Sequence, residues 1–360
     1  MAPLHYQLTE LTMDVLQVAP RYPPSVGGIQ RHVRELSEHL STEGHNITVL
    51  TTDRPGNKPK TEERNGVTIE RVPAYSSYLV APQVTSILRD RDPDVVHAHG
   101  YHSLTALFAR LGIGSTPFVF TPHYLGRRGR YTRKALLTLY DLVGRSIFRK
   151  ADQVIAVSEW ERDRLQSRFG TTPTVIPNGT DVERFANADP WNHDEPYIFC
   201  LGRLEEYKGI QHVIRALPNL EYDLLVAGVG PYTDELTAIA AAESVADRVD
   251  LLGYVDDDLI PRLYAGADVH ITLSEFECFG LTVAESLAAG TPCVVRDTTA
   301  LSEWIGVEGC VGISTPRPEG VISATERAAS LTPNRDQLMT WEEMAKTIEK
   351  EYVELFYRST

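Results

Sequence analysis

Two glutamates eight positions apart stand out in the C-terminal half of the sequence. Glu277 follows a short apolar run, and Glu285 lies in the apolar segment that comes next. We expect Phe279-Gly280-Leu281 to open a helix and Gly290 to end it, which puts Glu285 about one turn inside. A carboxylate among apolar residues needs a partner, because burying it bare is costly. Ribose hydroxyls would supply that partner, and an internal pair with an arginine is the alternative.

Two cations lie in a loop earlier in the same half. Arg203 and Lys208 follow the apolar run 197–201. An arginine can fork across two oxygens and a lysine adds a compact charge, so the pair suits a diphosphate. A solvated loop with chance basic residues is the alternative interpretation. The next turn, with Gly228 and Gly230, fits a nucleotide base or a bare turn equally well.

Adjacent glycines precede the first predicted helix, which spans residues 30–40. Gly27 and Gly28 would let the backbone approach a ligand closely and present free N–H groups to it. A plain tight turn explains the pair as well. The sequence contains no G-x-x-x-x-G-K-[ST] loop, so a phosphate-binding P-loop is not expected.

Short apolar strands alternate with amphipathic helical stretches along most of the chain. This alternation predicts parallel α/β layers. The predicted strands cover residues 13–18, 46–51, 95–98, 117–121, 154–157 and 174–176, and then 197–201, 223–227, 249–252, 269–272 and 293–295. A polar stretch at residues 187–195 between the two sets reads as a linker.

The restart of the pattern predicts two Rossmann-like α/β domains that face a central cleft. The expected boundaries are residues 1–183 for the N-terminal domain and 184–335 for the C-terminal domain, with a final helix at 336–360. Ligands of parallel sheets bind outside the carboxyl ends of the strands. The loops that carry Glu277, Arg203 and Lys208 follow such ends.

Composition matches an ordinary soluble protein, and the distribution of charge is uneven. Of the 360 residues, 42% are hydrophobic and 23% charged, and no apolar run reaches membrane-span length. The formal charge is −14, with +3 in residues 1–183 and −17 in residues 184–360. Seven lysines against 28 arginines favour adaptation to high salt, although a GC-rich genome would also favour arginine. The N-terminus does not read as a signal peptide, so a cytoplasmic protein with reduced cysteines is expected.

The two glutamates form an E-x7-E motif, and further motifs agree with it in order and spacing. These are Gly202-Arg203…Lys208-Gly209, Pro177-Asn-Gly-Thr-Asp181, Gly44-His45 and Asp94-Val-Val-His97-Ala-His99. In this pattern the chain resembles the large retaining GT-B glycosyltransferase family known as family 4. The resemblance runs over almost the whole chain. It implies the two-domain GT-B fold, with the C-terminal helix crossing back onto the N-terminal domain.

The resemblance also implies roles for matching positions. Arg203 and Lys208 would hold the donor diphosphate. Glu285 would bind the ribose, and Glu277 would contact hydroxyls of the transferred sugar. His123, in Phe120-Thr-Pro-His-Tyr124, matches a histidine near the reacting sugar, so that the implied catalytic set is His123, Glu277, Arg203 and Lys208. The other implied donor contacts are the backbone of Phe279, Gly280 and Leu281, the base-side residues Gly228 and Tyr254, and, from the N-terminal domain, Gly27 and Gly28.

These roles predict a hexosyltransferase that moves a sugar from UDP or GDP to a hydroxyl of a glycan or lipid-linked saccharide, with retention. No metal and no cofactor are expected. D-x-D pairs in Asp90-Arg-Asp92-Pro-Asp94 precede a strand and lie at its amino end. A further run, Asp256-Asp-Asp258, is expected to cap the start of a helix. A non-hydrolysing sugar-nucleotide epimerase and a catalytically silent nucleotide-sugar sensor are the alternatives. No nucleic-acid partner is expected.

Donor binding does not account for a basic segment at residues 124–150. The segment contains eight basic residues and a single acidic residue, Asp141, and it directly follows His123 in the sequence. A basic amphipathic stretch can lie on anionic lipid, which predicts peripheral contact with a membrane and a polyprenyl-phosphate-linked acceptor. A basic rim for soluble acceptors is the alternative. The residues assigned to this contact are Arg127, Arg128, Arg130, Arg133 and Lys134.

Overall fold

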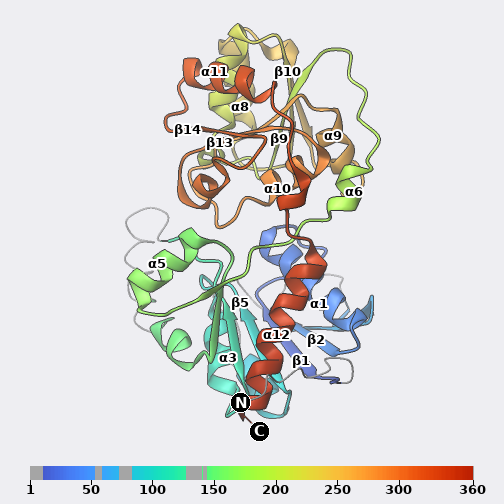
Figure 1. The fold of residues 1–360 in the computed structure, drawn as a ribbon, viewed down its shortest axis with the longest axis vertical. Helices are drawn as coiled ribbons and strands as arrows, with labels where there is room; N and C mark the ends of the chain where they lie inside the picture. Colours follow the sequence, from blue (N-terminus) through green and yellow to red (C-terminus); the bar gives the residue numbers. More distant parts are fainter. Residues whose placement is uncertain (1–10, 53–58, 73–82, 127–139, 141–143, 360) are drawn as a thin grey trace. The chain divides into compact units, whose positions relative to one another are not determined.

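The computed structural model describes residues 11–52, 59–72, 83–126, 140 and 144–359. The chain forms two compact units. The first comprises residues 1–177 together with 341–360, and the second comprises residues 178–340. Each unit is an α/β layer structure with its own sheet and core (Figure 1).

The sheet of the first unit runs in the order β3-β4-β2-β1-β5-β6-β7-β8. All neighbours pair in parallel except β3 and β4, which are antiparallel. Its strands are β1 (Asp14–Ala19), β2 (Asn46–Thr51), β3 (Thr61–Arg64), β4 (Val67–Arg71), β5 (Val95–His99), β6 (Phe118–Thr121), β7 (Gln153–Ala156) and β8 (Thr174–Val175). Its helices are α1 (Gly28–Thr42), α2 (Gln83–Arg89), α3 (Leu104–Gly112), α5 (Glu159–Phe169) and α12 (Trp341–Ser359).

The second unit carries a fully parallel sheet in the order β11-β10-β9-β12-β13-β14. Its strands are β9 (Tyr197–Leu201), β10 (Asp223–Ala227), β11 (Val249–Gly253), β12 (Val269–Thr272), β13 (Cys293–Arg296) and β14 (Cys310–Ile313). Its α-helices are α6 (Val182–Ala186), α7 (Ile210–Ala216), α8 (Thr233–Ala242), α9 (Ile260–Gly266), α10 (Leu281–Ala289) and α11 (Pro318–Ala328). Short 3₁₀ helices are η1 (Glu206–Lys208), η2 (Leu217–Asn219), η3 (Ala246–Arg248), η4 (Thr299–Trp304) and η5 (Arg335–Gln337).

Strand β9 shows why this sheet is buried on both faces. Successive side chains of a strand point to opposite faces. Ile198 and Cys200 accordingly belong to one apolar cluster, while Tyr197 and Phe199 belong to another. Parallel strands covered by helices on both faces read as continuous apolar runs, which is the pattern seen in the sequence.

The unit boundaries differ from those expected. The chain enters the second unit after Pro177, six residues before the expected boundary at 183, which falls within α6. The stretch 187–195, interpreted as a linker, packs on the second unit instead. His193 lies 2.8 Å from a carboxylate oxygen of Asp223, and the Trp191 N–H donates to the Arg262 carbonyl at 2.9 Å. Its polarity had suggested a solvated connection, whereas tertiary contacts satisfy its polar groups.

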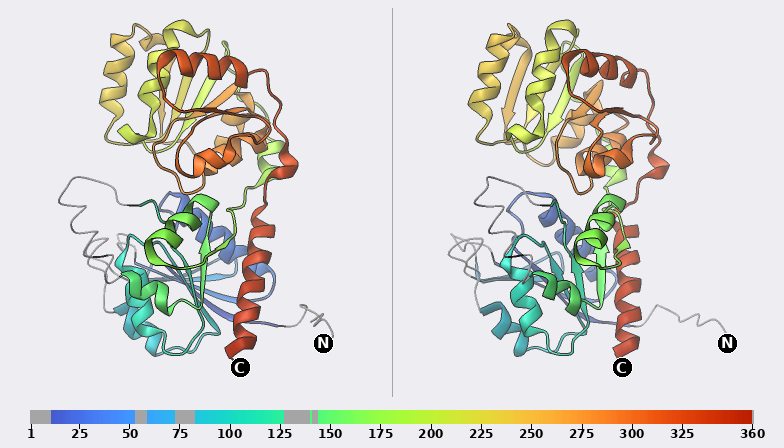
Figure 2. Two further views of the ribbon diagram at one scale, coloured as in Figure 1. Left: turned by 60° about the vertical axis from the view of Figure 1, so that its left-hand side comes forward. Right: turned by 90° about the vertical axis from the view of Figure 1, so that its left-hand side faces the viewer.

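The C-terminal helix α12 belongs to the first unit, as the resemblance implied. It begins at Trp341, five residues later than expected, after η5. The two views of Figure 2 show it running alongside the sheet of that unit. No helix in the described part of the chain is both long and apolar enough to cross a bilayer.

Candidate functional site

The two glutamates of the E-x7-E motif lie on either side of the N-terminus of α10, Glu277 before it and Glu285 within the helix. The helix begins at Leu281 and ends at Gly290, as expected. Gly280 (φ 102°) and Gly290 (φ 89°) both adopt the left-handed conformation, which glycine takes without a Cβ penalty. Glu285 is therefore the fifth residue of the helix, one turn in from its N-terminus.

Glu285 is buried, with 4% of its surface exposed. The Tyr264 hydroxyl from α9 donates to its Oε2 at 3.4 Å. An ionised carboxylate offers about four acceptor positions, so this one hydrogen bond does not exhaust the acceptor capacity of Glu285.

Glu277 lies in the loop between β12 and α10 and forms an ion pair with Lys208. The Lys208 Nζ donates to Glu277 Oε1 at 2.6 Å, and both side chains are about one-fifth exposed. The backbone of Glu277 is fixed as well, because its N–H donates to Thr299 Oγ1 at 3.0 Å. The structure thus brings together two predicted site residues that lie 69 positions apart in the sequence. An ammonium carries three donors, so this pairing is compatible with a phosphate contact.

Arg203 lies five residues before Lys208 in the loop after β9. Its side chain is 60% exposed and contacts Glu205 at 3.1 Å.

Gly228, after β10, packs against the start of the same loop. A Cβ added to Gly228 would lie 1.8 Å from the Gly202 carbonyl oxygen, so no other residue can occupy this position. The carboxyl ends of β9 and β10 are therefore joined by close backbone packing.

Two further residues predicted to bind the donor are Phe279, which precedes α10, and Tyr254, which follows β11. The Phe279 carbonyl accepts from Trp304 Nε1 at 2.7 Å, and their rings pack edge to face. This contact fixes the backbone just before α10. Tyr254 follows β11 and is 62% exposed. A large exposed ring at a strand's carboxyl end could stack on a flat group.

The first unit contributes a second group of predicted residues. Gly27 precedes α1 as its N-terminal cap residue and Gly28 begins that helix. His123 follows β6 and is buried, with a left-handed backbone (φ 47°). That conformation costs a non-glycine residue free energy and is concentrated at functional sites. Its pKa is held well below the ordinary value near 6.5 by burial and by the neighbouring His32 and His97, so the ring is neutral.

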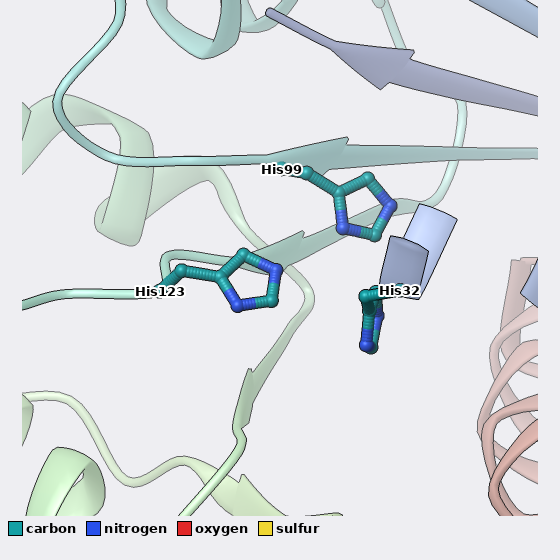
Figure 3. Close-up of side chains that lie close together, drawn as sticks. All are labelled: His32, His99 and His123. Atoms are coloured by element: carbon teal, nitrogen blue, oxygen red, sulfur yellow. The ribbon is translucent and has the colours of Figure 1, made fainter. Parts of the chain in front are cut away.

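Residues that sequence reasoning did not single out surround His123. His32 from α1 and His99 from β5 lie beside it, with ring centroids at 5.0 Å and 6.0 Å (Figure 3). His99 belongs to a motif used for the family resemblance, whereas His32 carries no local signal. The five basic residues assigned to the acceptor, Arg127, Arg128, Arg130, Arg133 and Lys134, lie outside the described residues.

The D-x-D segment does not lie at a ligand-binding edge. Asp94 immediately precedes β5, and its Oδ2 accepts from the Asp14 N–H at 2.7 Å. Both residues are at the amino ends of their strands. The segment caps the sheet at the edge opposite His123.

Comparisons with known proteins agree with this architecture. The profile described as Glycosyltransferase Family 4 matches residues 26–184, and the profile described as Glycosyl transferases group 1 matches residues 181–351. Glycogen synthase of Mycobacterium tuberculosis is 30% identical over 88% of this chain and 86% of that protein. Phosphatidyl-myo-inositol mannosyltransferase of the same species is 30% identical over 81% of this chain and 79% of that protein.

Solved structures share the fold at lower identity. Sucrose-phosphate synthase from Thermosynechococcus elongatus is similar with a TM-score of 0.81 at 20% identity, over 96% of this chain and 100% of that one. HepE from Anabaena, in complex with UDP and glucose, gives a TM-score of 0.69 at 17% identity, over 96% and 98%. The chain belongs to glycosyltransferase family 4 and is a sugar-transferring enzyme with the GT-B fold.

Proposed function

We propose that this glycosyltransferase transfers a hexose from UDP or GDP to a hydroxyl of a glycan or lipid-linked saccharide, with retention and without a metal. The observation that carries the proposal is the arrangement at α10. A lysine–carboxylate pair stands before its N-terminus, and a second carboxylate is buried one turn inside. The positive end of a helix together with a fixed ammonium suits a diphosphate.

The donor roles follow from these positions. Lys208 and Arg203 bind the diphosphate, and the backbone of Phe279, Gly280 and Leu281 contacts the sugar and phosphate. Glu285 accepts hydrogen bonds from the ribose hydroxyls, since a carboxylate offers about four acceptor positions. Tyr254 and Gly228 lie near the base. Glu277 orients hydroxyls of the sugar while its charge is balanced by Lys208.

In the proposed reaction the nucleoside diphosphate leaves the anomeric carbon along an oxocarbenium-like path. The acceptor hydroxyl oxygen forms the new bond to the anomeric carbon on the same face, and the departing phosphate oxygen accepts the proton of that hydroxyl. Arg203, Lys208 and the α10 N-terminus stabilise the negative charge that develops on the diphosphate. His123 lies near the reacting sugar as a neutral hydrogen-bonding group, and Gly27 and Gly28 offer backbone N–H groups to the phosphates and acceptor.

The acceptor is proposed to be an anionic lipid-linked saccharide at the cytoplasmic face of a membrane. The basic segment beside His123 motivates this choice, and the mannosyltransferase relative is named for a lipid acceptor.

The test begins with a thermal-shift screen of the full chain against UDP- and GDP-sugars. The sugar that stabilises the protein is then assayed for nucleotide release with and without a polyprenyl-linked saccharide. We expect acceptor-dependent release and a product whose anomeric configuration, read by NMR, equals that of the donor. An epimerase would convert the donor without acceptor-dependent release, and a sensor would bind it without turnover. Either result would overturn the proposal.

A further inference from the structure

Three buried histidines converge near the carboxyl edge of the sheet in the first unit. His32 comes from the first turns of α1, His99 ends β5, and His123 follows β6 (Figure 3). Each offers a ring nitrogen, and these nitrogens all lie within 4.8 Å of one another. Three residues from separate elements thus present three imidazoles to a common point.

The spacing is close to that of a metal site. With Zn–N bonds of 2.0–2.1 Å, tetrahedral coordination places ligand nitrogens about 3.3 Å apart. The rings of His32 and His99 are 5.3 Å apart between centroids, and those of His32 and His123 are 5.0 Å apart. Side-chain rotations that move each ring nitrogen by about 1 Å would bring the three nitrogens to the distances needed around one ion.

A chain of hydrogen bonds fixes the tautomer of His99. The Gln17 Nε2 donates to the Tyr352 hydroxyl at 3.1 Å, so Gln17 Oε1 is the atom that accepts from His99 Nε2 at 2.8 Å. The Tyr352 hydroxyl in turn lies 2.6 Å from His97 Nδ1. With its proton on Nε2, His99 presents a lone pair on Nδ1.

Two of the ring nitrogens have no hydrogen-bond partner among the residues that the structure describes. They are His99 Nδ1 and His123 Nε2, and both are buried. A buried polar atom without a partner costs free energy and calls for an explanation such as an ion. Burial, together with the neighbouring imidazoles, also holds the pKa of His99 and His123 well below 6.5. A lowered pKa favours the neutral form of these two rings, which is the form that binds metals.

We propose that His32, His99 and His123 form a binding site for one divalent transition-metal cation of the zinc class, with the fourth coordination position open. Imidazole ligands select zinc, copper or nickel, whereas magnesium and calcium prefer oxygen. Gln17 is the outer partner that orients His99, as carbonyl groups commonly do for metal-binding histidines.

Occupation of this site inhibits the enzyme. This part rests on the proposed function, in which His123 lies near the reacting sugar. A cation bound to His123 Nε2 would make that nitrogen unavailable for hydrogen bonding to the substrate. It would also place a new positive charge beside the acceptor. The binding itself does not depend on that function.

The first experiment is titration of metal-stripped full-length protein with ZnCl₂ by calorimetry. We expect one equivalent bound, and X-ray absorption should show imidazole ligands at about 2.0–2.1 Å. His32→Gln and His99→Gln should each lose this binding. The control His39→Gln, on the same helix but outside the cluster, should retain it. Absence of binding to the wild type, or equal binding by all variants, would overturn the site.

A second variant separates orientation from ligation. Gln17→Leu keeps all three imidazoles but removes the acceptor of His99 Nε2, so zinc affinity should fall about 10- to 100-fold. Unchanged affinity in a folded Gln17→Leu protein would contradict the proposed tautomer.

The inhibition is tested on nucleotide release with the donor found in the screen. Zinc should suppress release by the wild type, and His32→Gln should remain active and insensitive. If zinc binds the cluster yet leaves release unchanged, the inhibitory role is wrong. If no donor is turned over even without zinc, the proposed function fails, and the calorimetry still decides the site.

Discussion

Glu285 is a buried carboxylate on an otherwise apolar helix, held by the hydroxyl of Tyr264. Its neighbours Val283, Ala284 and Leu287 belong to the apolar cluster on one face of the sheet. A buried carboxylate in this position either stabilises the fold of the second unit or binds a ligand. The two roles make different predictions.

Glu285→Ala should weaken donor binding by about 1.5–3 kcal/mol, the usual range for a hydrogen bond to a charged group. Calorimetry with the stabilising nucleotide sugar measures this directly. Glu319→Ala, in the first turn of α11, is the control and should bind normally. If Glu285→Ala unfolds while the remaining folded protein binds donor normally, Glu285 is a structural residue.

Glu161 on α5 is a second buried carboxylate, and it connects two loops. Its oxygens accept from the backbone N–H groups of Val157, at 2.8 Å, and Tyr124, the residue after His123. Burial raises the pKa of Glu161 from about 4.5 to about 7, despite these two bonds, which favour the charged form.

This shift predicts a pH dependence of stability. Between pH 4.5 and 7 the folded state keeps the Glu161 proton while the unfolded state releases it. The contribution of Glu161 to stability is therefore complete below pH 4.5 and declines as pH rises to 7, by up to about 3 kcal/mol. Urea unfolding of wild type and Glu161→Gln across this range should show the wild-type advantage shrinking with rising pH. A constant difference would mean that Glu161 titrates at its ordinary pKa.

At the scale of elements, α12 is held to the first unit by polar groups as well as apolar packing. Tyr352 is fully buried between Gln17 of β1 and His97 of β5. Glu349, one turn earlier, lies 3.0 Å from His45 Nε2. Helix α12 is thus hydrogen-bonded to β1 and β5, and β5 also carries His99 of the histidine cluster.

Tyr352→Phe should lower the free energy of unfolding by about 1–3 kcal/mol, because it leaves Gln17 and His97 with buried unpaired groups. The exposed Tyr357, on the same helix, offers a matched control, and Tyr357→Phe should change stability little. Urea denaturation measures both. Equal stability of the two variants would show that the hydrogen-bond chain contributes nothing.

At the scale of the whole molecule, metal independence is the first expectation. Activity should persist in excess EDTA, since Glu277 is paired with Lys208 and the D-x-D segment at residues 90–94 lies at the amino edge of its sheet. Loss of activity with EDTA and recovery with Mg²⁺ or Mn²⁺ would overturn this. Stimulation by EDTA would instead agree with the inhibitory histidine site.

Membrane contact is the second expectation at this scale, and it rests on the sequence. The variant with Arg127, Arg128, Arg130 and Arg133 changed to Ser should lose co-sedimentation with anionic vesicles, since each basic residue near such a surface contributes about 1 kcal/mol. At molar salt the Debye length falls to about 3 Å, so wild-type binding should weaken as well. A control removes the same charge from exposed arginines elsewhere, namely Arg215, Arg317, Arg327 and Arg358.

Equal sedimentation of wild type and the four-arginine variant would reject the contact. The same conclusion would follow if neither protein bound while both acted normally on a soluble acceptor.

The sequence by itself determined the local features of this protein. The apolar runs of β9, β10 and β12 and the glycines that bound α10 are readable because strand and helix periods, and left-handed turns, depend on nearby residues. The E-x7-E motif, together with the other motifs that agree with it in sequence order, indicated the family. The boundary after Pro177 was not readable, because tertiary contacts rather than composition place residues 178–195 with the second unit.

Only the tertiary structure decided which distant residues meet. Lys208 pairs with Glu277 because β9 and β12 are neighbours in the sheet, an order that no local pattern specifies. His32, His99 and His123 converge because β5 and β6 end, and α1 begins, at one edge of the sheet. Tyr352, from the other end of the chain, supports them through its hydrogen bonds to Gln17 and His97. Such contacts depend on strand order and helix packing, which are set by the burial of the whole core. That is the physical reason why the histidine cluster could be found only in the folded molecule.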